Sequence, residues 1–430
     1  MNNTILSNTF PVTDFGQTKQ KVLNWVQRFN TFCFLDNHQY HIEPHTQECI
    51  AGAGIRRKLI ADAGMALEQL QQLLDAKRTW LFGHLAYDLK NELDDLSSHH
   101  PDAIQFPVLF FFEPEIIVRL NGNEMTIEAG EPAEIFEAIN SQSPVARLAK
   151  RETPLIKNRI QREEYLSIIR QLQKHILRGD CYEINFCQEF FAEKTTIDPV
   201  RVYQQLAEVS PNPFSALYRV NDKWLICASP ERFLMKKGNH VLSQPIKGTS
   251  KRITDNAARD EESKEQLYHS DKDRSENVMI VDLVRNDLSK ICQEGTVKVD
   301  ELYGIYSFPQ VHQMVSTVSG ELKKNVSFTD MIKATFPMGS MTGAPKKRVI
   351  ELIEQYEKTA RGIFSGALGY ISPEGDFDFN VVIRSIMYNA SSGYLSFQAG
   401  SGITFYSNPE MEWEECLLKA EAIKKVLSSD

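Results

Sequence analysis

The segment Ser243–Arg252 reads SQPIKGTSKR and lies between an apolar, strand-like run and a polar stretch typical of a helix start. Pro245 and Gly248 flank Lys247, and proline and glycine fix the path of a backbone. A lysine held in this way at the end of an apolar strand can point into the protein. A free lysine has a pKa near 10.4, so only about one in a thousand is neutral and nucleophilic near pH 7.5. Burial beside other cations would lower that pKa, whereas the alternative is a lysine whose ammonium reaches the surface.

Outward from this segment the pattern predicts antiparallel strands and amphipathic helices. Short apolar runs separated by turn residues predict successive strands over 214–246 and a series of hairpins over 364–405. Apolar residues at helical spacing predict helices along the whole chain. The expected helices include 18–29, 55–74, 161–178, 256–269, 274–292 and 409–427.

The chain is expected to form two parts. Residues 1–140 are expected to form an N-terminal lobe, and residues 155–427 a catalytic domain. The stretch 141–158 between them is polar and holds two prolines, which is typical of a linker.

A glycine-rich loop, MGSMTGAP at 338–345, precedes a helix expected over 345–357, with Thr342 as a possible N-cap. The free N–H groups of a helix start can bind a carboxylate or phosphate, although a simple helix cap explains the loop equally well. The loop lacks the spacing of a P-loop, so nucleotide binding is not predicted.

Composition excludes several classes of protein. The 430 residues are 42% hydrophobic and 24% charged, which is ordinary for a soluble globular protein. The net charge of −9 disfavours nucleic-acid binding, and no apolar run is long enough to predict a membrane span. No signal peptide is recognised at the N-terminus. The seven cysteines are odd in number and without a C-x-x-C pair, so reduced thiols in the cytoplasm are expected.

Carboxylates on two predicted helices form a candidate metal site. Glu412, Glu415 and Lys419 share one face of the last helix and border its apolar stripe. Glu276 borders the buried stripe of another helix. Carboxylates at the edge of a buried face are costly unless they are paired or bind a cation, and Mg²⁺ prefers oxygen ligands. The alternative is two solvated helix faces with ordinary ion pairs.

Other residues are candidates for substrate contacts. In AGSGI at 399–403, two glycines at the end of a strand would let a ligand approach the backbone, and Arg384 on a neighbouring strand could clamp a carboxylate. A tight hairpin with a surface arginine is the alternative. His312 fits a hydrogen-bonded core histidine as well as a ligand-binding one. Glu231 is either a surface turn residue or, if enclosed, a general acid with a raised pKa.

Strings along most of residues 155–425 resemble the large subunits of the chorismate-utilising enzymes, and they occur in that family's order. They include GDCYEINFCQ, ASPERFL, PIKGT, DRSENVMIVDLVRNDL, FPMGSMTGAPK and AGSGI. In this family the lysine of PIKGT marks the members that aminate chorismate at C4, because anthranilate-forming members carry alanine there. The resemblance implies an α+β fold in which two antiparallel sheets pack as a sandwich surrounded by helices, with the site between the sheets.

The resemblance also implies roles for individual residues. Lys247 would attack C2 of chorismate and form a covalent adduct, and Glu231 would protonate the departing C4 hydroxyl. Ammonia would then add at C4 and expel the lysine. The implied ligands of Mg²⁺ are Glu276, Glu412 and Glu415. The residues implied to contact the substrate ring or its enolpyruvyl carboxylate are Thr249, His312, Tyr370, Arg384, Gly400 and Gly402.

Two places depart from the family pattern. Aminating members usually carry Gln where this chain has Glu183, and water-using members carry a lysine there. The string FCFLDNHQY at 32–40 only partly resembles the tryptophan-binding string of other members, so the resemblance leaves tryptophan binding in the N-terminal lobe open.

The resemblance implies that a separate glutamine amidotransferase subunit supplies the ammonia. Formation of anthranilate, isochorismate or salicylate is the alternative activity. A binding protein without turnover is a further alternative, but it would have no reason to keep several buried charges that lower stability.

Overall fold

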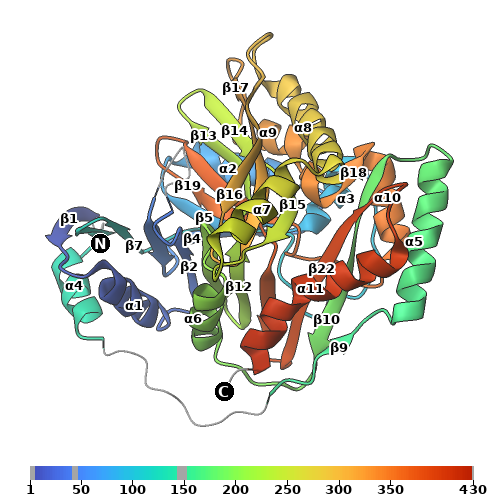
Figure 1. The fold of residues 1–430 in the computed structure, drawn as a ribbon. Helices are drawn as coiled ribbons and strands as arrows, with labels where there is room; N and C mark the ends of the chain where they lie inside the picture. Colours follow the sequence, from blue (N-terminus) through green and yellow to red (C-terminus); the bar gives the residue numbers. More distant parts are fainter. Residues whose placement is uncertain (1–4, 41–46, 143–152, 429–430) are drawn as a thin grey trace.

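The computed structural model describes residues 5–40, 47–142 and 153–428 and shows two large antiparallel sheets with helices around them (Figure 1). The first sheet has 12 strands. In spatial order they are β1 (Leu6–Pro11), β8 (Glu124–Ala129), β7 (Ile116–Asn121), β3 (Cys49–Ala53), β2 (Thr31–Asp36), β11 (Phe214–Val220), β12 (Lys223–Ser229), β21 (Ser385–Asn389), β22 (Tyr394–Ile403), β10 (Glu183–Ala192) and β18 (Gly343–Ala344), with β9 (Lys157–Asn158) also beside β10.

The second sheet has 10 strands. Their order is β15 (Ile246–Lys251), β17 (Val311–Glu321), β14 (His240–Gln244), β13 (Arg232–Lys237), β20 (Phe377–Val381), β19 (Ala367–Ile371), β5 (Leu81–Leu85), β6 (Leu109–Glu113) and β4 (Arg57–Ala61), with β16 (Lys298–Ser307) also beside β17.

The helices of the described chain surround these sheets (Figure 1). They are α1 (Phe15–Val26), α2 (Ala66–Ala76), α3 (Lys90–Asp94), α4 (Pro132–Asn140), α5 (Arg162–Leu177), α6 (Pro199–Val209), α7 (Ala257–Tyr268), α8 (Asp271–Ile291), α9 (Phe328–Thr335), α10 (Lys346–Tyr356) and α11 (Pro409–Ser428), together with the 3₁₀ turns η1 (Tyr87–Leu89) and η2 (Gly339–Met341). None of these helices is long and apolar enough to cross a membrane.

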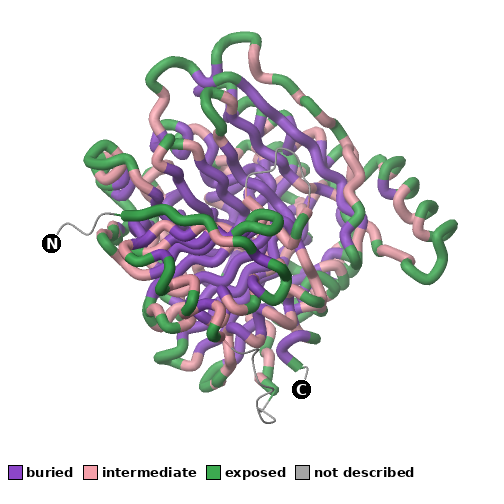
Figure 2. The backbone as a smooth tube through the Cα atoms, turned by 90° about the vertical axis from the view of Figure 1, so that its left-hand side faces the viewer, coloured by how far each residue is buried: buried purple, intermediate pink, exposed green. Residues whose placement is uncertain are grey.

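One hydrophobic core fills the space between the sheets and a second lies under the helices outside the first sheet. The inner core joins residues of both sheets, such as Tyr218 and Phe82, and continues to residues of α2, α8 and α9. The outer core joins Phe186 and Phe190 to helices α5 and α11. Successive side chains of a strand point to opposite faces, and β10 alternates between the two cores. The buried backbone accordingly runs through the centre of the molecule (Figure 2). The predicted sandwich of two antiparallel sheets is confirmed.

Both predicted parts of the chain contribute to both sheets. Strand β2 pairs with β11, and β5 pairs with β19, so residues before 140 and after 155 share backbone hydrogen bonds. The division into an N-terminal lobe and a catalytic domain stays a prediction. Most of the expected linker, 143–152, lies outside the described residues, and its end forms β9.

Two local predictions are wrong. The helix expected over 55–74 is a strand, β4, followed by the shorter helix α2, because residues 57–61 pair with the neighbouring strand β6. Thr342 does not cap a helix: its Oγ1 donates to the carbonyl oxygen of Met338, and Pro345 is the N-cap of α10.

Candidate active site

A bulge in the edge strand β15 aims Lys247 inward. The pairing of β15 with β17 shifts register between Ile246 and Thr249, which places Lys247 and Gly248 in the irregular step. Gly248 has a φ of +94°, which side chains other than glycine rarely adopt, and a Cβ there would lie 3.0 Å from the Cβ of Asp273. Bulges re-aim side chains in this way. Lys247 is only 9% exposed, so the surface alternative is excluded for this side chain.

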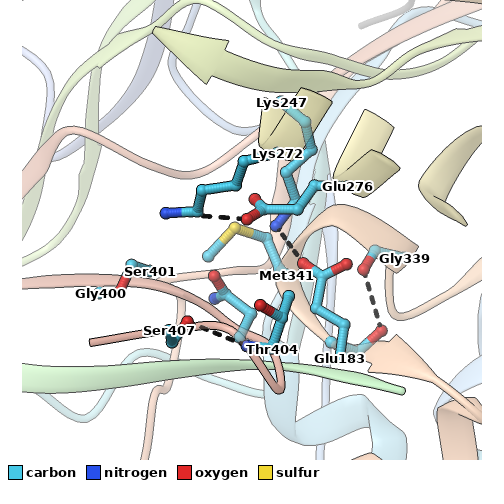
Figure 3. Close-up of polar contacts among 12 residues, drawn as sticks. Glu183, Lys247, Lys272, Glu276, Gly339, Met341, Gly400, Ser401, Thr404 and Ser407 are labelled. Carbon is cyan, nitrogen blue, oxygen red and sulfur yellow. Dashed lines mark hydrogen bonds and ion pairs between the residues drawn. The ribbon is translucent and has the colours of Figure 1, made fainter. Parts of the chain in front are cut away.

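Lys247 reaches across to the opposite sheet and forms an ion pair with Glu183. Its Nζ lies 2.6 Å from Oε1 of Glu183, the first residue of β10 (Figure 3). Glu183 is 1% exposed, and its Oε2 has no hydrogen-bond partner among the described residues. Gly402 on β22 leaves room for this pair, since a Cβ there would lie 2.5 Å from Glu183 Oε1 and 2.9 Å from Lys247 Nζ.

Carboxylates rather than cations surround Lys247, and the expectation of an uncharged amine beside other cations is wrong for this state. Burial lowers the pKa of Lys247. The negative charges of Glu183, Glu276 and Glu231 raise it by a larger amount, so the pKa lies above its ordinary value. The resting side chain is therefore an ammonium. It becomes a nucleophile only after it gives a proton away.

Glu231 is enclosed between β12 and β13, as a general acid requires. It is 3% exposed, and burial raises its pKa to about 7 against the opposing effects of Ser340 and Lys247. Arg384 is close enough to act on the same carboxyl group, and burial lowers the pKa of that arginine to about 10. Near neutral pH, the carboxyl group of Glu231 is therefore protonated in some molecules and ionised in others. Its role stays a prediction.

The predicted metal ligands Glu276 of α8 and Glu412 of α11 both form ion pairs with the side chain of Lys272. Lys272 Nζ lies 3.9 Å from Glu276 Oε1 and 3.6 Å from Glu412 Oε1 (Figure 3 shows the first contact). Glu276 Oε1 is buried without a hydrogen-bond partner in the described chain, and burial raises the pKa of Glu276 to about 7. Glu412 accepts a short hydrogen bond, 2.5 Å, from Ser401 Oγ.

Glu415 lies one helical turn after Glu412 and pairs with Lys419 at 2.7 Å. Burial acts to raise the pKa of Glu415, but Lys419 lowers it overall. Oxygen donors on two helices, one of them buried and without a hydrogen bond in the described chain, suit a hard cation such as Mg²⁺. The described residues nevertheless contain no cluster of three or more metal-ligating side chains close enough to hold a metal as they stand. The metal site stays a prediction.

Tyr370, a predicted substrate contact, has neighbours other than Lys247 and Arg384. Tyr370 lines a separate cavity of about 60 Å³ with Asp36, Phe214 and Arg232, and the described lining of that cavity includes neither Lys247 nor Arg384. The ring of Tyr370 packs against those of Trp80 and Phe82, which explains its orientation. A substrate contact by Tyr370 together with Arg384 stays a prediction.

The surroundings of His312 fit the alternative of a buried histidine that is held by hydrogen bonds. It is 1% exposed, its Nδ1 lies 2.8 Å from Ser307 Oγ, and its Nε2 lies 3.2 Å from Asp260 Oδ1. Thr249 is exposed on β15, where it pairs with Gln313. Neither residue contacts Lys247 or Glu183 through a hydrogen bond in the described chain, so ring contacts by them stay predictions.

Gly400 and Gly402 were both predicted to contact the substrate, and the structure shows a different reason for glycine at each position. A Cβ on Gly400 would lie 1.9 Å from the backbone oxygen of Phe186, so the sheet itself requires glycine there. Gly402 instead makes room for the side chains of the site. Backbone contacts of either glycine with a substrate stay predictions.

Two functional candidates had weaker signals in the sequence. Glu183 appeared only as a departure from a family pattern, and its pairing with Lys247 crosses between sheets. Lys272 precedes Glu276 by four residues on one helix, and that spacing is a usable signal for an ion pair.

Comparison with known proteins shows the family of this chain. The family model for chorismate binding enzymes matches residues 23–425. An aminodeoxychorismate synthase component 1 from Salmonella typhimurium is 39% identical over 67% of this chain and 63% of its own length. An anthranilate synthase component I-like protein from Synechocystis is 34% identical over 81% of this chain and 72% of its own length.

Solved structures show the same fold at lower identity. Anthranilate synthase component I from Streptococcus pneumoniae has a TM-score of 0.78 at 23% identity, covering 90% of this chain and 94% of that one. The menaquinone-specific isochorismate synthase MenF from Escherichia coli has a TM-score of 0.79 at 17% identity, covering 99% and 94%. The chain belongs to the family of chorismate binding enzymes.

Proposed function

We propose that this chain aminates chorismate at C4, as the synthase component that makes 4-amino-4-deoxychorismate from chorismate and ammonia. The observation that carries the proposal is Lys247, buried between the sheets at the PIKGT position and in contact with a carboxylate. A buried lysine among carboxylates is held close to a proton acceptor, which is what a nucleophilic amine needs. Relatives named as aminodeoxychorismate synthases support the same activity.

The residues of the site divide the reaction into two displacements. Lys247 attacks C2, the ring double bonds shift, and the C4–O bond breaks. Glu231, with a pKa raised to about 7, gives its proton to the departing oxygen, which leaves as water. Ammonia then attacks C4, the double bonds shift back, and the C2–N bond breaks to free Lys247. Two positioned displacements replace one difficult step.

Magnesium is part of this proposal. Glu276, Glu412 and Glu415 would hold it, and it would supply positive charge beside the ring carboxylate of chorismate. Lys272 lies between two of these carboxylates in the structure and would have to yield its place. Arg384 would pair with the second carboxylate of the substrate.

The proposal also includes a partner and a setting. A separate glutamine amidotransferase subunit would deliver ammonia, and the product would serve the formation of 4-aminobenzoate and folate in the cytoplasm. Ammonium salts should replace the partner in vitro, because free ammonia is the attacking species in the proposed step.

Identification of the product tests the proposal. The purified chain is mixed with chorismate, Mg²⁺ and ammonium chloride, and the products are separated by chromatography with mass detection. We expect 4-amino-4-deoxychorismate. Anthranilate, which the name of the Synechocystis relative makes the second candidate, or isochorismate would contradict the proposal.

A further inference from the structure

Glu183 presents a carboxylate to the reacting atom of the proposed mechanism. Its Oε1 lies 2.6 Å from Lys247 Nζ, a hydrogen bond along which a proton can move directly. The Nζ of an ammonium has no lone pair, so a bond from nitrogen to carbon requires that one proton leave first. Glu183 is the group that touches this nitrogen in the described chain through a hydrogen bond.

The fold holds Glu183 in this place at a cost. Glu183 begins β10, where it pairs with Ala344 of β18, and it is 1% exposed. Its Oε2 is buried without a hydrogen-bond partner among the described residues. An unpartnered buried carboxylate oxygen lowers the free energy of unfolding, so packing alone does not account for it. Gly402, which pairs with Asn185 on β10, leaves the space that the side chains of Glu183 and Lys247 need.

The other carboxylates near Lys247 have different tasks. Glu276 shares Lys272 with Glu412 and belongs to the proposed metal site. Glu231 must hold a proton for the C4 hydroxyl at the moment when Lys247 must lose one. In the described chain the hydrogen bond from Lys247 Nζ goes to Glu183 and not to Glu231, which leaves the two tasks to separate carboxyl groups.

We propose that Glu183 is the proton acceptor and later the proton donor for Lys247, an inference that rests on the proposed amination. In the first displacement one ammonium proton passes from Nζ to Glu183 Oε1, and the freed electron pair forms the N–C2 bond. The C4–O bond breaks with its electron pair, and the oxygen takes the proton of Glu231 and leaves as water.

The second displacement reverses these transfers. The electron pair of ammonia forms the N–C4 bond, and the C2–N bond breaks with its pair on Lys247. That nitrogen takes back the proton from Glu183, while Glu231 receives a proton from the new ammonium at C4. Both carboxyl groups and the lysine return to their starting states, so no further reactant is required.

Single-turnover adduct formation tests this role. Glu183→Gln keeps the shape of the side chain but accepts no proton there, and Glu189→Gln removes another buried carboxylate from the same strand as the control. Each is mixed with chorismate and Mg²⁺ without ammonia, and the covalent adduct is followed by intact-protein mass. We expect Glu183→Gln to slow adduct formation about 100-fold while chorismate binding, measured by calorimetry, stays within about threefold. The Glu189→Gln rate should match that of the wild type.

Chemical rescue adds a second measurement. Glu183→Ala should lose adduct formation and regain it in proportion to added formate, with chloride as the inert control, because formate can accept the proton in the vacated space. An unchanged or faster rate in Glu183→Gln overturns the role, as does a loss in Glu183→Ala that formate does not restore. A wild-type chain that forms no adduct, or Lys247→Ala that still makes product, instead overturns the proposed function and this role with it.

Discussion

The ion pair between Lys247 and Glu183 joins the two sheets of the molecule across 2.6 Å. Lys247 stands on the edge strand of the 10-stranded sheet, and Glu183 begins a strand of the 12-stranded sheet. Neither sheet alone would hold a lysine and a glutamate in this relation. The site therefore depends on how the sandwich closes.

Lys247→Ala should abolish covalent capture of chorismate. Wild-type protein mixed with chorismate and Mg²⁺, in the absence of ammonia, is expected to gain the mass of chorismate minus water. The alanine variant lacks the nucleophile and should show no gain by intact-protein mass spectrometry. A variant that keeps full turnover would show that the lysine does not react.

The pH dependence of adduct formation should follow Glu231. Its pKa is raised to about 7 by burial, so the acid form that donates a proton is lost as the pH rises above 7. With Mg²⁺ and chorismate saturating, the rate should fall about tenfold per pH unit well above that value. Glu231→Gln should lose about 100-fold or more in rate.

The raised pKa of Glu231 also predicts how the stability of the protein changes with pH. A carboxyl group whose pKa is higher in the folded state than in the unfolded state binds its proton more tightly when folded. Its contribution to stability is present below the ordinary value of 4.5 and is lost as the pH rises through about 7. Glu231→Gln should therefore flatten the loss of melting temperature between pH 5 and pH 8, and an unaltered profile would count against a buried Glu231.

Glu276→Gln should affect metal dependence far more than folding. The amide keeps the size of the side chain but removes a charged ligand, so half-maximal activity should require at least about tenfold more Mg²⁺. Melting temperature without metal should change little, since a buried carboxylate with an unpartnered oxygen contributes little to stability. A large loss of melting temperature with an unchanged Mg²⁺ requirement would assign Glu276 a structural role.

Two glycines on β22 offer a matched comparison. Gly400→Ala places a Cβ 1.9 Å from a backbone oxygen of β10, which cannot move aside, so it should cost about 1–3 kcal/mol of stability or more. For Gly402→Ala the atoms nearest to the new Cβ are the ends of two flexible side chains, Glu183 and Lys247. It should reduce adduct formation at least about tenfold while lowering the melting temperature less than Gly400→Ala does. Equal thermal shifts with equal activity would contradict this distinction.

The sequence determined most of the helices and strands, and it singled out Lys247, Glu231 and Glu276, which the structure buries. The spacing of apolar residues predicted α5, α8 and α11 closely, because a helix buries one stripe with a period that is visible in the chain. The helix expected over 55–74 failed because a short apolar run fits a strand as well as a helix, and the partner strand β6 decides.

The charge state of Lys247 could not be predicted from the sequence. Residues 183, 231 and 276 are distant from 247 along the chain, and only the packing of the sheets brings their carboxylates around it. The position of Tyr370 was decided in the same way, by the rings of Trp80 and Phe82. Local residue order specifies helices, strands and family, because these depend on neighbours in the chain. The electrostatics of the site depend on distances through space, which only the closed tertiary structure sets.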